Sequence, residues 1–195
     1  MRAALLDSYS RPAHLRLADV PEPEPGRGQV RIAVRAVGIN PRDWLLCEGR
    51  YVFRHLVPGF PKIPGSDVSG VIDAVGEGVR RSRVGDEVVA MQTLFGRMGA
   101  YAERFVVDEA AVGRKPSRMS FEEAAGLPVA ALTALQMLRD DGALEAGETV
   151  AVVGASGGVG HYAVQLARHL GATVVGVCSA ASHDLVLGLG AHRVL

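Results

Sequence analysis

The sequence predicts an α/β protein in which a β domain precedes the first half of a doubly wound parallel sheet. Residues 1–112 read as short strands broken by Gly and Pro, without a long helical pattern, which is typical of an all-β barrel or sandwich. Residues 149–195 instead alternate strands with helices, as a parallel sheet requires. We expect the two domains to span residues 1–118 and 119–195.

Alternating hydrophobic residues and turn residues locate the strands of the N-terminal domain. The expected strands are residues 3–9, 15–20, 29–37, 67–75, 87–91 and 100–107. The first two should form a hairpin, followed by an extended connector at residues 21–25, because three prolines fix the backbone there. Residues 38–64 show no regular pattern but are rich in aromatic residues, so we expect an irregular segment and not a simple linker.

Helix signals begin after this domain. Ser120 and Glu123 form a capping-box pattern, and Pro128 stands where a second helix starts that should run to Leu138. From Thr149 onward, strands and helices alternate. We expect strands at 149–153, 173–178 and 192–195, and helices at 161–170 and 182–189.

Composition argues against several classes of function. The 195 residues carry 21 basic and 21 acidic side chains, and no basic stripe predicts a nucleic-acid partner. The sequence shows neither a signal peptide nor a membrane-spanning run, and Cys47 and Cys178 do not make a disulfide framework. We therefore expect a cytoplasmic protein without a nucleic-acid or membrane partner.

Residues 154–160, with the sequence GASGGVG, predict a dinucleotide-binding turn. A buried strand precedes them and a helix follows, so the helix N-terminus can offer N–H groups and a positive dipole end to a pyrophosphate. Gly157 would let the backbone approach the ligand, and Gly160 would let the helix pack on the strand. The candidate cofactor-binding residues here are Ala155, Ser156, Gly157, Gly158, Val159 and Gly160.

This interpretation has two alternatives, of which the sequence excludes one. A phosphate-binding P-loop is excluded, because His161 follows Gly160 where that motif needs Lys. A tight strand-to-helix turn without a ligand remains open.

The second expected strand is followed by residues that indicate which dinucleotide binds. NAD-selective sites usually place an acid about twenty residues after the glycines, on the ribose 2′-hydroxyl. Here no acid precedes Asp184, whereas Ser179, Ser182 and His183 can donate to a 2′-phosphate. We therefore expect NADP, bound in its reduced form NADPH. Ser182 could alternatively cap the following helix.

Several separate segments resemble one known family. They are GINPRD at 38–43, PKIPGSDVSGVIDAVGEGV at 61–79, GDEVVA at 85–90, GAYAERFVV at 99–107 and AALTALQML at 130–138. Together with the glycine loop they resemble the medium-chain dehydrogenase/reductases, and most of all their zinc-independent quinone oxidoreductase and enone reductase branch. The resemblance covers the whole chain. It implies a GroES-like β-barrel domain, a Rossmann domain, and hydride transfer from NADPH to a small-molecule quinone or α,β-unsaturated carbonyl.

The resemblance also bears on metals. Zinc-dependent members of the family bind the catalytic ion through a Cys and through the His of a Gly-His-Glu triplet, and they carry a four-cysteine structural lobe. This sequence has Asn40 and Ser66 at the two ligand positions and lacks the lobe. We therefore expect no zinc and no metal-binding residues.

Without a metal, hydrogen-bond donors must polarise the substrate carbonyl. The resemblance implies catalytic roles for Asn40, whose amide would donate to the carbonyl oxygen, and for Tyr51, whose hydroxyl would protonate the developing enolate. Each has a structural alternative, which is a turn before Pro41 for Asn40 and packing against Phe53 for Tyr51.

Two further positions match the family. Thr133 corresponds to a residue that lies against the nicotinamide, although its hydroxyl could simply bond a carbonyl one turn back in a helix. Asp67 corresponds to the acid of the zinc triplet, and without a metal we expect it to accept hydrogen bonds from loop N–H groups.

The resemblance finally implies that family members continue beyond the length of this chain. We therefore expect an N-terminal portion of an enzyme that forms a homodimer in its full-length form, with strand edges left uncovered in this portion. The alternatives are a non-catalytic fragment or interaction module, and an alcohol dehydrogenase-like enzyme that uses NAD(P).

Overall fold

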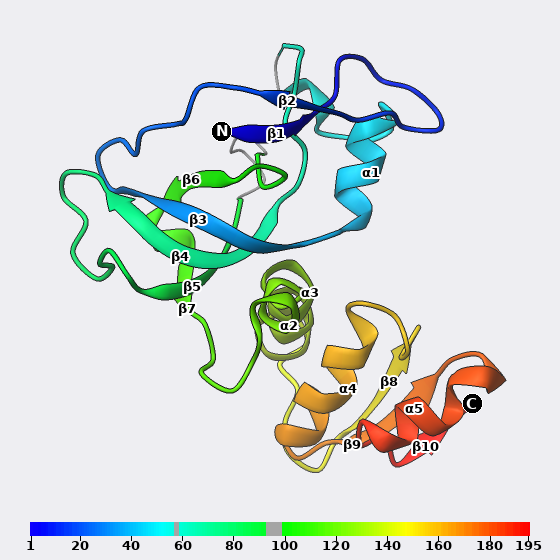
Figure 1. The fold of residues 1–195 in the computed structure, drawn as a ribbon. Helices are drawn as coiled ribbons and strands as arrows, with labels where there is room; N and C mark the ends of the chain where they lie inside the picture. Colours follow the sequence, from blue (N-terminus) through cyan, green and yellow to red (C-terminus); the bar gives the residue numbers. More distant parts are fainter. Residues whose placement is uncertain (57–58, 93–98) are drawn as a thin grey trace. The chain divides into compact units, whose positions relative to one another are not determined.

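The chain divides into two compact units, Met1–Val129 and Ala130–Leu195. The computed structural model describes residues 1–56, 59–92 and 99–195 (Figure 1). The expected α/β class is confirmed, since antiparallel strands make up most of the first unit and parallel strands with helices the second. The division falls within helix α3 (Pro128–Gln136). The domain boundary expected at 118/119 stays a prediction.

A five-stranded antiparallel sheet with the order β6-β3-β4-β5-β7 dominates the first unit. Its strands are β3 (Gln29–Gly38), β4 (Asp67–Val75), β5 (Glu87–Met91), β6 (Arg104–Asp108) and β7 (Val112–Arg114). The expected first hairpin is present as a separate sheet of β1 (Arg2–Leu5) and β2 (Arg16–Asp19). The predictions for β4 and β5 are confirmed residue for residue, whereas β7 was missed because three residues show no alternation.

Alternation along β3 builds the core of this unit. Val30 and Ile32 are fully buried and pack with Val68, Ile72 and Phe105 from neighbouring strands. The pairing of β3 with β4 shifts register twice, and such bulges bend and twist a strand. The buried side chains of β3, β4, β5 and β6 thus form one core.

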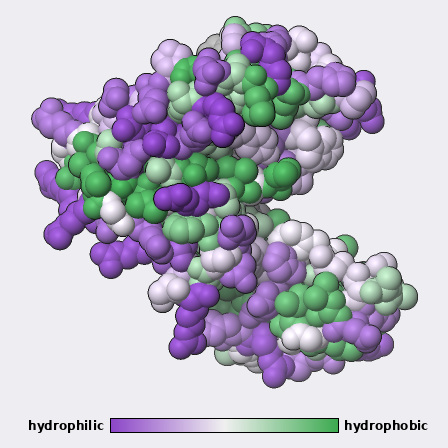
Figure 2. All heavy atoms as spheres, viewed as in Figure 1, coloured by the Kyte–Doolittle hydropathy of each residue, from purple (hydrophilic) through white to green (hydrophobic). Residues whose placement is uncertain are grey.

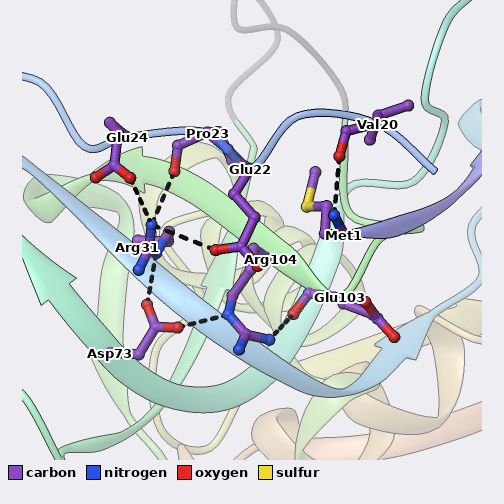
Figure 3. A network of polar contacts seen from close by, with 9 residues as sticks. All are labelled: Met1, Val20, Glu22, Pro23, Glu24, Arg31, Asp73, Glu103 and Arg104. Atoms are coloured by element: carbon purple, nitrogen blue, oxygen red, sulfur yellow. Dashed lines mark hydrogen bonds and ion pairs between the residues drawn. The ribbon is translucent and has the colours of Figure 1, made fainter.

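The opposite face of the same strands carries an ionic network that fixes the proline-rich connector (Figure 3). Arg31 of β3 donates from Nε to Asp73 Oδ1 of β4 at 2.8 Å and from Nη1 to Glu24 Oε1 of the connector at 3.1 Å. Arg104 of β6 pairs through Nε with Asp73 Oδ2 at 2.6 Å. One aspartate thus joins two arginines from different strands, and the connector is tied to the sheet.

The expectation of an irregular segment at 38–64 was wrong in part. Helix α1 (Pro41–Cys47) lies within it, and a 3₁₀ turn, η1 (Arg54–Leu56), follows. Proline at the first helical position and the 2.8 Å hydrogen bond from Asn40 N–H to Asp43 Oδ2 start the helix. Seven residues are too few to show a clear helical period, so only the Asn-Pro-x-Asp start signal was readable.

Short helical elements lie at and before the junction of the two units in the chain. The turn η2 (Glu109–Ala111) precedes β7, whereas α2 (Phe121–Ala125), α3 and a π-helical turn, η3 (Met137–Asp141), follow it. The predicted capping box at Ser120 is confirmed, because Ser120 Oγ accepts from Glu123 N–H at 3.2 Å and Glu123 Oε2 accepts from Ser120 N–H at 2.8 Å. The expected helix start at Pro128 is confirmed as well.

The second unit is a three-stranded parallel sheet with the order β10-β9-β8. It contains β8 (Thr149–Val153), α4 (Gly160–His169), β9 (Thr173–Val177), η4 (Ala180–Ser182), α5 (His183–Gly188) and β10 (Arg193–Val194). Val152, Val164, Val174 and Val186 belong to one buried core, so both helices pack on the same face of the sheet. The predicted alternation of strands and helices is confirmed.

Apolar surface remains on this unit. Val153 at the end of β8 is 81% exposed, and β8 is an edge strand whose outer side pairs with no other described strand. Figure 2 shows hydrophobic surface over α5, where Leu185 and Leu187 are exposed. Among the described helices, none has the length and apolar character needed to cross a membrane.

Candidate functional site

The glycine loop turns back tightly at the end of β8. The N–H groups of Gly154 and Ala155 both donate to Val177 O, at 2.9 and 3.0 Å, and Gly157 N–H donates to Gly154 O at 2.9 Å. Gly154 has a φ of 73°, which favours glycine. Ala155 is fully buried and packs in the core, so only its backbone faces the turn.

The exposed side of the loop keeps several N–H groups available. Within the described residues, the N–H groups of Ser156, Gly158 and Val159 donate to no backbone carbonyl, and all three residues are exposed. A Cβ on Gly158 would meet nothing within 4 Å, and one on Gly157 would meet only Gly154 O, at 3.2 Å. The ten-residue helix α4 starts immediately afterwards. These residues fit an oxygen-rich anion such as the pyrophosphate of a dinucleotide.

Gly160 allows the close backbone contact that the turn requires. It is buried, and a Cβ there would lie 2.1 Å from Gly154 O and 2.8 Å from Gly154 C. The first residue of α4 therefore packs directly against the backbone of the loop's first residue. Any larger side chain would push the helix away from β8.

The residues after β9 form the second part of the candidate cofactor site. Ser179 is exposed, and its Oγ lies 3.3 Å from Ser182 Oγ. Ser182 directly precedes α5 but makes no side-chain capping bond, so the structure gives the capping alternative no support. His183 is the first residue of α5. The three side chains predicted to bind a 2′-phosphate thus fall within five consecutive residues at the end of β9.

In the first unit, Asp43 is the centre of a buried polar cluster. This residue of α1 is 1% exposed and accepts from Asn40 N–H and Ser66 Oγ at 2.8 Å each and from the Tyr101 hydroxyl at 3.2 Å. Burial raises the pKa of Tyr101, so its hydroxyl stays protonated and donates. Three chain segments are thereby held by one carboxyl group.

Asp67, the first residue of β4, is the second acid of the cluster. It is 1% exposed, and its Oδ2 accepts from Asn40 Nδ2 at 3.0 Å and from Val129 N–H, in the first turn of α3, at 3.1 Å. Its Oδ1 is buried without a hydrogen-bond partner. The side chain thus links the residue before α1 to the start of α3.

Burial dominates the electrostatics of the two acids. It raises the pKa of Asp67 to about 6, against the hydrogen bonds from Asn40 and Val129 that lower it. Burial also raises the pKa of Asp43, and the hydrogen bond from Asn40 N–H opposes that rise. The positive charge of Arg42 lowers the pKa of both carboxyl groups.

The raised pKa of Asp67 predicts a specific pH dependence of stability. The folded state binds this proton more tightly than the unfolded state, whose pKa is near 3.8, so the contribution of Asp67 to stability falls as pH rises through about 6. We expect the unfolding free energy of Asp67→Asn, minus that of the wild type, to increase between about pH 4 and about pH 7. Urea unfolding at a series of pH values measures it. A difference that stays constant across this range would contradict the assignment.

Asn40 and Ser66 stand at the positions that the resemblance assigns to the zinc ligands of zinc-dependent family members, and both donate hydrogen bonds to carboxylates. Asn40, 8% exposed, donates to Asp67, and the fully buried Ser66 donates to Asp43. Across residues 1–56, 59–92 and 99–195, no group of three or more His, Cys, Asp or Glu side chains is arranged to hold a metal ion. A zinc site needs such nitrogen, sulfur and oxygen donors.

Tyr51 is connected to the polar cluster by Arg42, whose guanidinium lies over the Tyr51 ring. The Tyr51 hydroxyl is buried without a partner, and its ring packs edge-on to Phe53 with centroids 5.9 Å apart and against Leu46. Arg42 Cζ lies 5.9 Å from the centre of the Tyr51 ring. The predicted packing of Tyr51 against Phe53 is therefore present, and the Tyr51 hydroxyl makes no hydrogen bond.

The family resemblance places Arg42 beside the site, within the segment 40–43, but the sequence indicated no role for its side chain and did not point to Tyr101. Arg42 donates from Nη1 to Gln92 O at 3.3 Å, and Tyr101 reaches Asp43 across 58 residues of sequence. Both partnerships join distant segments, so no local pattern signals them. The motif around Asn40 was the only available pointer to Arg42.

Thr133 belongs to α3 in the second unit. Its side chain is half-buried, and the described structure contains no hydrogen bond from its hydroxyl to a carbonyl one turn back. The structural alternative for Thr133 therefore has no support, and its role at the nicotinamide stays a prediction.

Comparison with known proteins places these features in a family. Residues 26–117 match the alcohol dehydrogenase GroES-like domain. The chain is 40% identical over 202 residues to the chloroplast envelope quinone oxidoreductase homolog of Arabidopsis thaliana, covering 100% of this chain and 60% of that protein. It is 36% identical over 196 residues to the quinone oxidoreductase of Homo sapiens, covering 100% of this chain and 58% of the relative. The chain belongs to the medium-chain dehydrogenase/reductase superfamily, in its quinone oxidoreductase-like branch.

Solved structures agree with this membership. The quinone oxidoreductase from Coxiella burnetii matches with a TM-score of 0.91 and 32% identity, covering 100% of this chain and 62% of that one. The quinone oxidoreductase of Pseudomonas syringae pv. Tomato DC3000 matches with a TM-score of 0.88 and 32% identity, covering 100% and 58%. The predicted GroES-like domain followed by a partial Rossmann sheet is confirmed. The chain spans about three fifths of the length of the curated relatives it matches.

Proposed function

We propose that the protein is a zinc-independent oxidoreductase that delivers hydride from NADPH to a small-molecule quinone or α,β-unsaturated carbonyl. One observation carries this proposal: at the two positions where zinc-dependent relatives bind their catalytic ion, Asn40 and Ser66 each donate to a buried carboxylate. Because both side chains already hydrogen-bond to carboxylates, hydrogen bonding and proton donation remain as the means of activating a substrate carbonyl.

The residues of the first unit act on the substrate in this proposal. Asn40 uses one amide N–H for Asp67, so its second N–H remains to polarise the substrate carbonyl. The unpartnered Tyr51 hydroxyl protonates the enolate or hydroquinone oxygen. Bound NADPH supplies the hydride. Asp67 holds the side-chain amide of Asn40, and Asp43 holds its backbone N–H.

The residues of the second unit hold the cofactor. The exposed N–H groups of Ser156, Gly158 and Val159 bind the pyrophosphate, and Gly157 and Gly160 keep the loop open and tightly turned. Ala155 contributes its backbone to the turn. Ser179, Ser182 and His183 bind the 2′-phosphate of NADPH, and Thr133 lies against the nicotinamide.

Cofactor choice is tested at Ser179. We expect the wild-type protein to bind NADPH more tightly than NADH, and Ser179→Asp to weaken NADPH binding about tenfold or more, because a carboxylate beside a phosphate costs several kcal/mol. The same variant should bind NADH at least as well as the wild type, since an acid accepts from the 2′-hydroxyl. Equilibrium titration by fluorescence quenching measures both dissociation constants.

An exposed serine near the N-terminus provides the matched control. Ser8→Asp adds the same charge on the surface and should leave both dissociation constants unchanged. Equal affinity of the wild type for NADPH and NADH, unaltered in Ser179→Asp, would contradict the choice of NADPH.

We also propose a cytoplasmic location and a homodimer for the full-length protein. The two free cysteines support a reducing compartment, because neither Cys47 nor Cys178 forms a disulfide. The exposed leucines of α5, Leu185 and Leu187, support association. Sedimentation of the full-length protein tests the dimer, and fractionation of cells tests the location.

A further inference from the structure

Unpartnered polar atoms concentrate at one place in the first unit. Four buried side-chain atoms of the described residues lack a hydrogen-bond partner, and one of them, Arg104 Nε, still forms an ion pair with Asp73. The other three are Arg42 Nε, Tyr51 Oη and Asp67 Oδ1. A buried polar atom left without a hydrogen bond destabilises the folded protein. Their concentration at the candidate site indicates that a ligand completes them.

Arg42 is the only cation among the three residues. Its guanidinium donates from Nη1 to Gln92 O, a neutral acceptor, and lies over the Tyr51 ring with Cζ 5.9 Å from the centroid. Among the described residues, no carboxylate lies within ion-pair distance of it, whereas the arginines of the connector network pair with acids directly. The half-buried charge of Arg42 is therefore uncompensated at close range.

The two unpartnered donors differ in chemistry. The guanidinium of Arg42 can stabilise negative charge without giving up a proton, whereas the phenol of Tyr51 can transfer one. An oxygen atom that becomes negative during a reaction and is then protonated uses both groups in turn. Hydride addition to a quinone or an enone creates such an oxygen, because the displaced π electrons move onto it.

We propose that Arg42 binds the substrate oxygen that becomes an oxyanion on hydride transfer, and that Tyr51 then protonates this oxygen. The inference rests on the proposed function and assigns the main electrostatic role to Arg42, with Asn40 as a second donor. NADPH is oxidised, the substrate carbon gains the hydride, the substrate oxygen gains the Tyr51 proton, and the Tyr51 phenolate recovers a proton from water. Asp43 and Asp67, through their negative charge, help retain the guanidinium at the cluster.

The kinetic test uses Arg42→Gln and Arg42→Lys in the full-length protein. We expect Arg42→Gln to lower kcat for a benzoquinone or an enone about a hundredfold with little change in KM, as removal of one oxyanion donor does. Arg42→Lys keeps the charge and should recover part of this loss. The control is Arg16→Gln, which removes an exposed arginine paired with Asp7 and should leave kcat unchanged. Thermal unfolding of each variant separates loss of fold from loss of catalysis.

A binding test separates the inference from the proposed function. 4-Nitrophenol reports its ionisation by absorbance, and its phenolate imitates the oxyanion. We expect the wild type to bind the phenolate more tightly than the phenol, and Arg42→Gln to lose at least tenfold of this preference. Phenolate binding that depends on Arg42 supports the inference even if no quinone is reduced. Quinone reduction with unchanged kcat and unchanged phenolate affinity in folded Arg42→Gln would overturn the inference and leave the proposed function standing.

Discussion

Replacing Gly160 with alanine should lower the free energy of unfolding by about 3 kcal/mol. The new Cβ would lie 2.1 Å from Gly154 O and 2.9 Å from Ala155 Cα, and these are backbone atoms that cannot rotate away. Helix α4 must then shift from the loop, so NADPH binding should be lost as well. Urea unfolding and a fluorescence titration with NADPH measure the two effects.

Gly158 provides the matched control in the same loop. A Cβ at this position meets nothing within 4 Å, and its backbone is not in the left-handed region. Gly158→Ala should therefore change the free energy of unfolding by no more than about 0.5 kcal/mol. Equal stability of the Gly160→Ala and Gly158→Ala proteins would show that the loop does not have the packing described above.

Removing the carboxyl group of Asp43 should have a similarly large effect. Asp43→Ala leaves three donors unpaired, namely Asn40 N–H and the hydroxyls of Ser66 and Tyr101, at a cost of about 1–3 kcal/mol each. Relief of the cost of burying the acid offsets part of this loss. We expect a net decrease of about 3 kcal/mol in the free energy of unfolding, measured by urea denaturation.

Tyr101→Phe measures the contribution of one hydrogen-bond donor, for comparison with loss of the whole Asp43 carboxyl group. It removes one of the three donors and leaves Asp43 with the other two, so it should cost only about 1 kcal/mol. If Asp43→Ala were no more destabilising than Tyr101→Phe, Asp43 would not be the centre of the cluster.

The fold was predictable where hydrophobic alternation or turn residues were strong. β4 and β5 follow from valine-rich apolar runs next to glycine turns, and the start of α3 follows from Pro128. Helix α1 was missed because seven residues give little periodicity, although Asn40 and Pro41 marked its start. Strands as short as β7 depend on their partners, here β5, and not on their own sequence.

The candidate site was predictable only as separate residues. Asn40, Ser66 and Asp67 followed from the family resemblance, and the glycine loop followed from its own pattern. Their pairings did not, because Ser66 reaches Asp43 across 23 residues and Tyr101 reaches it across 58. Arg42 was marked only by the motif around Asn40, since its lack of an ion-pair partner among the described residues is visible only in three dimensions.

The most direct test of the central proposal is the rate of NADPH consumption by the full natural chain with a simple benzoquinone and with an α,β-unsaturated ketone. The rate should depend on the substrate, should be faster with NADPH than with NADH, and should not change after dialysis against a chelator or after addition of zinc. Turnover that disappears with the chelator and returns with zinc, or no turnover of either substrate, would contradict a zinc-independent quinone or enone reductase.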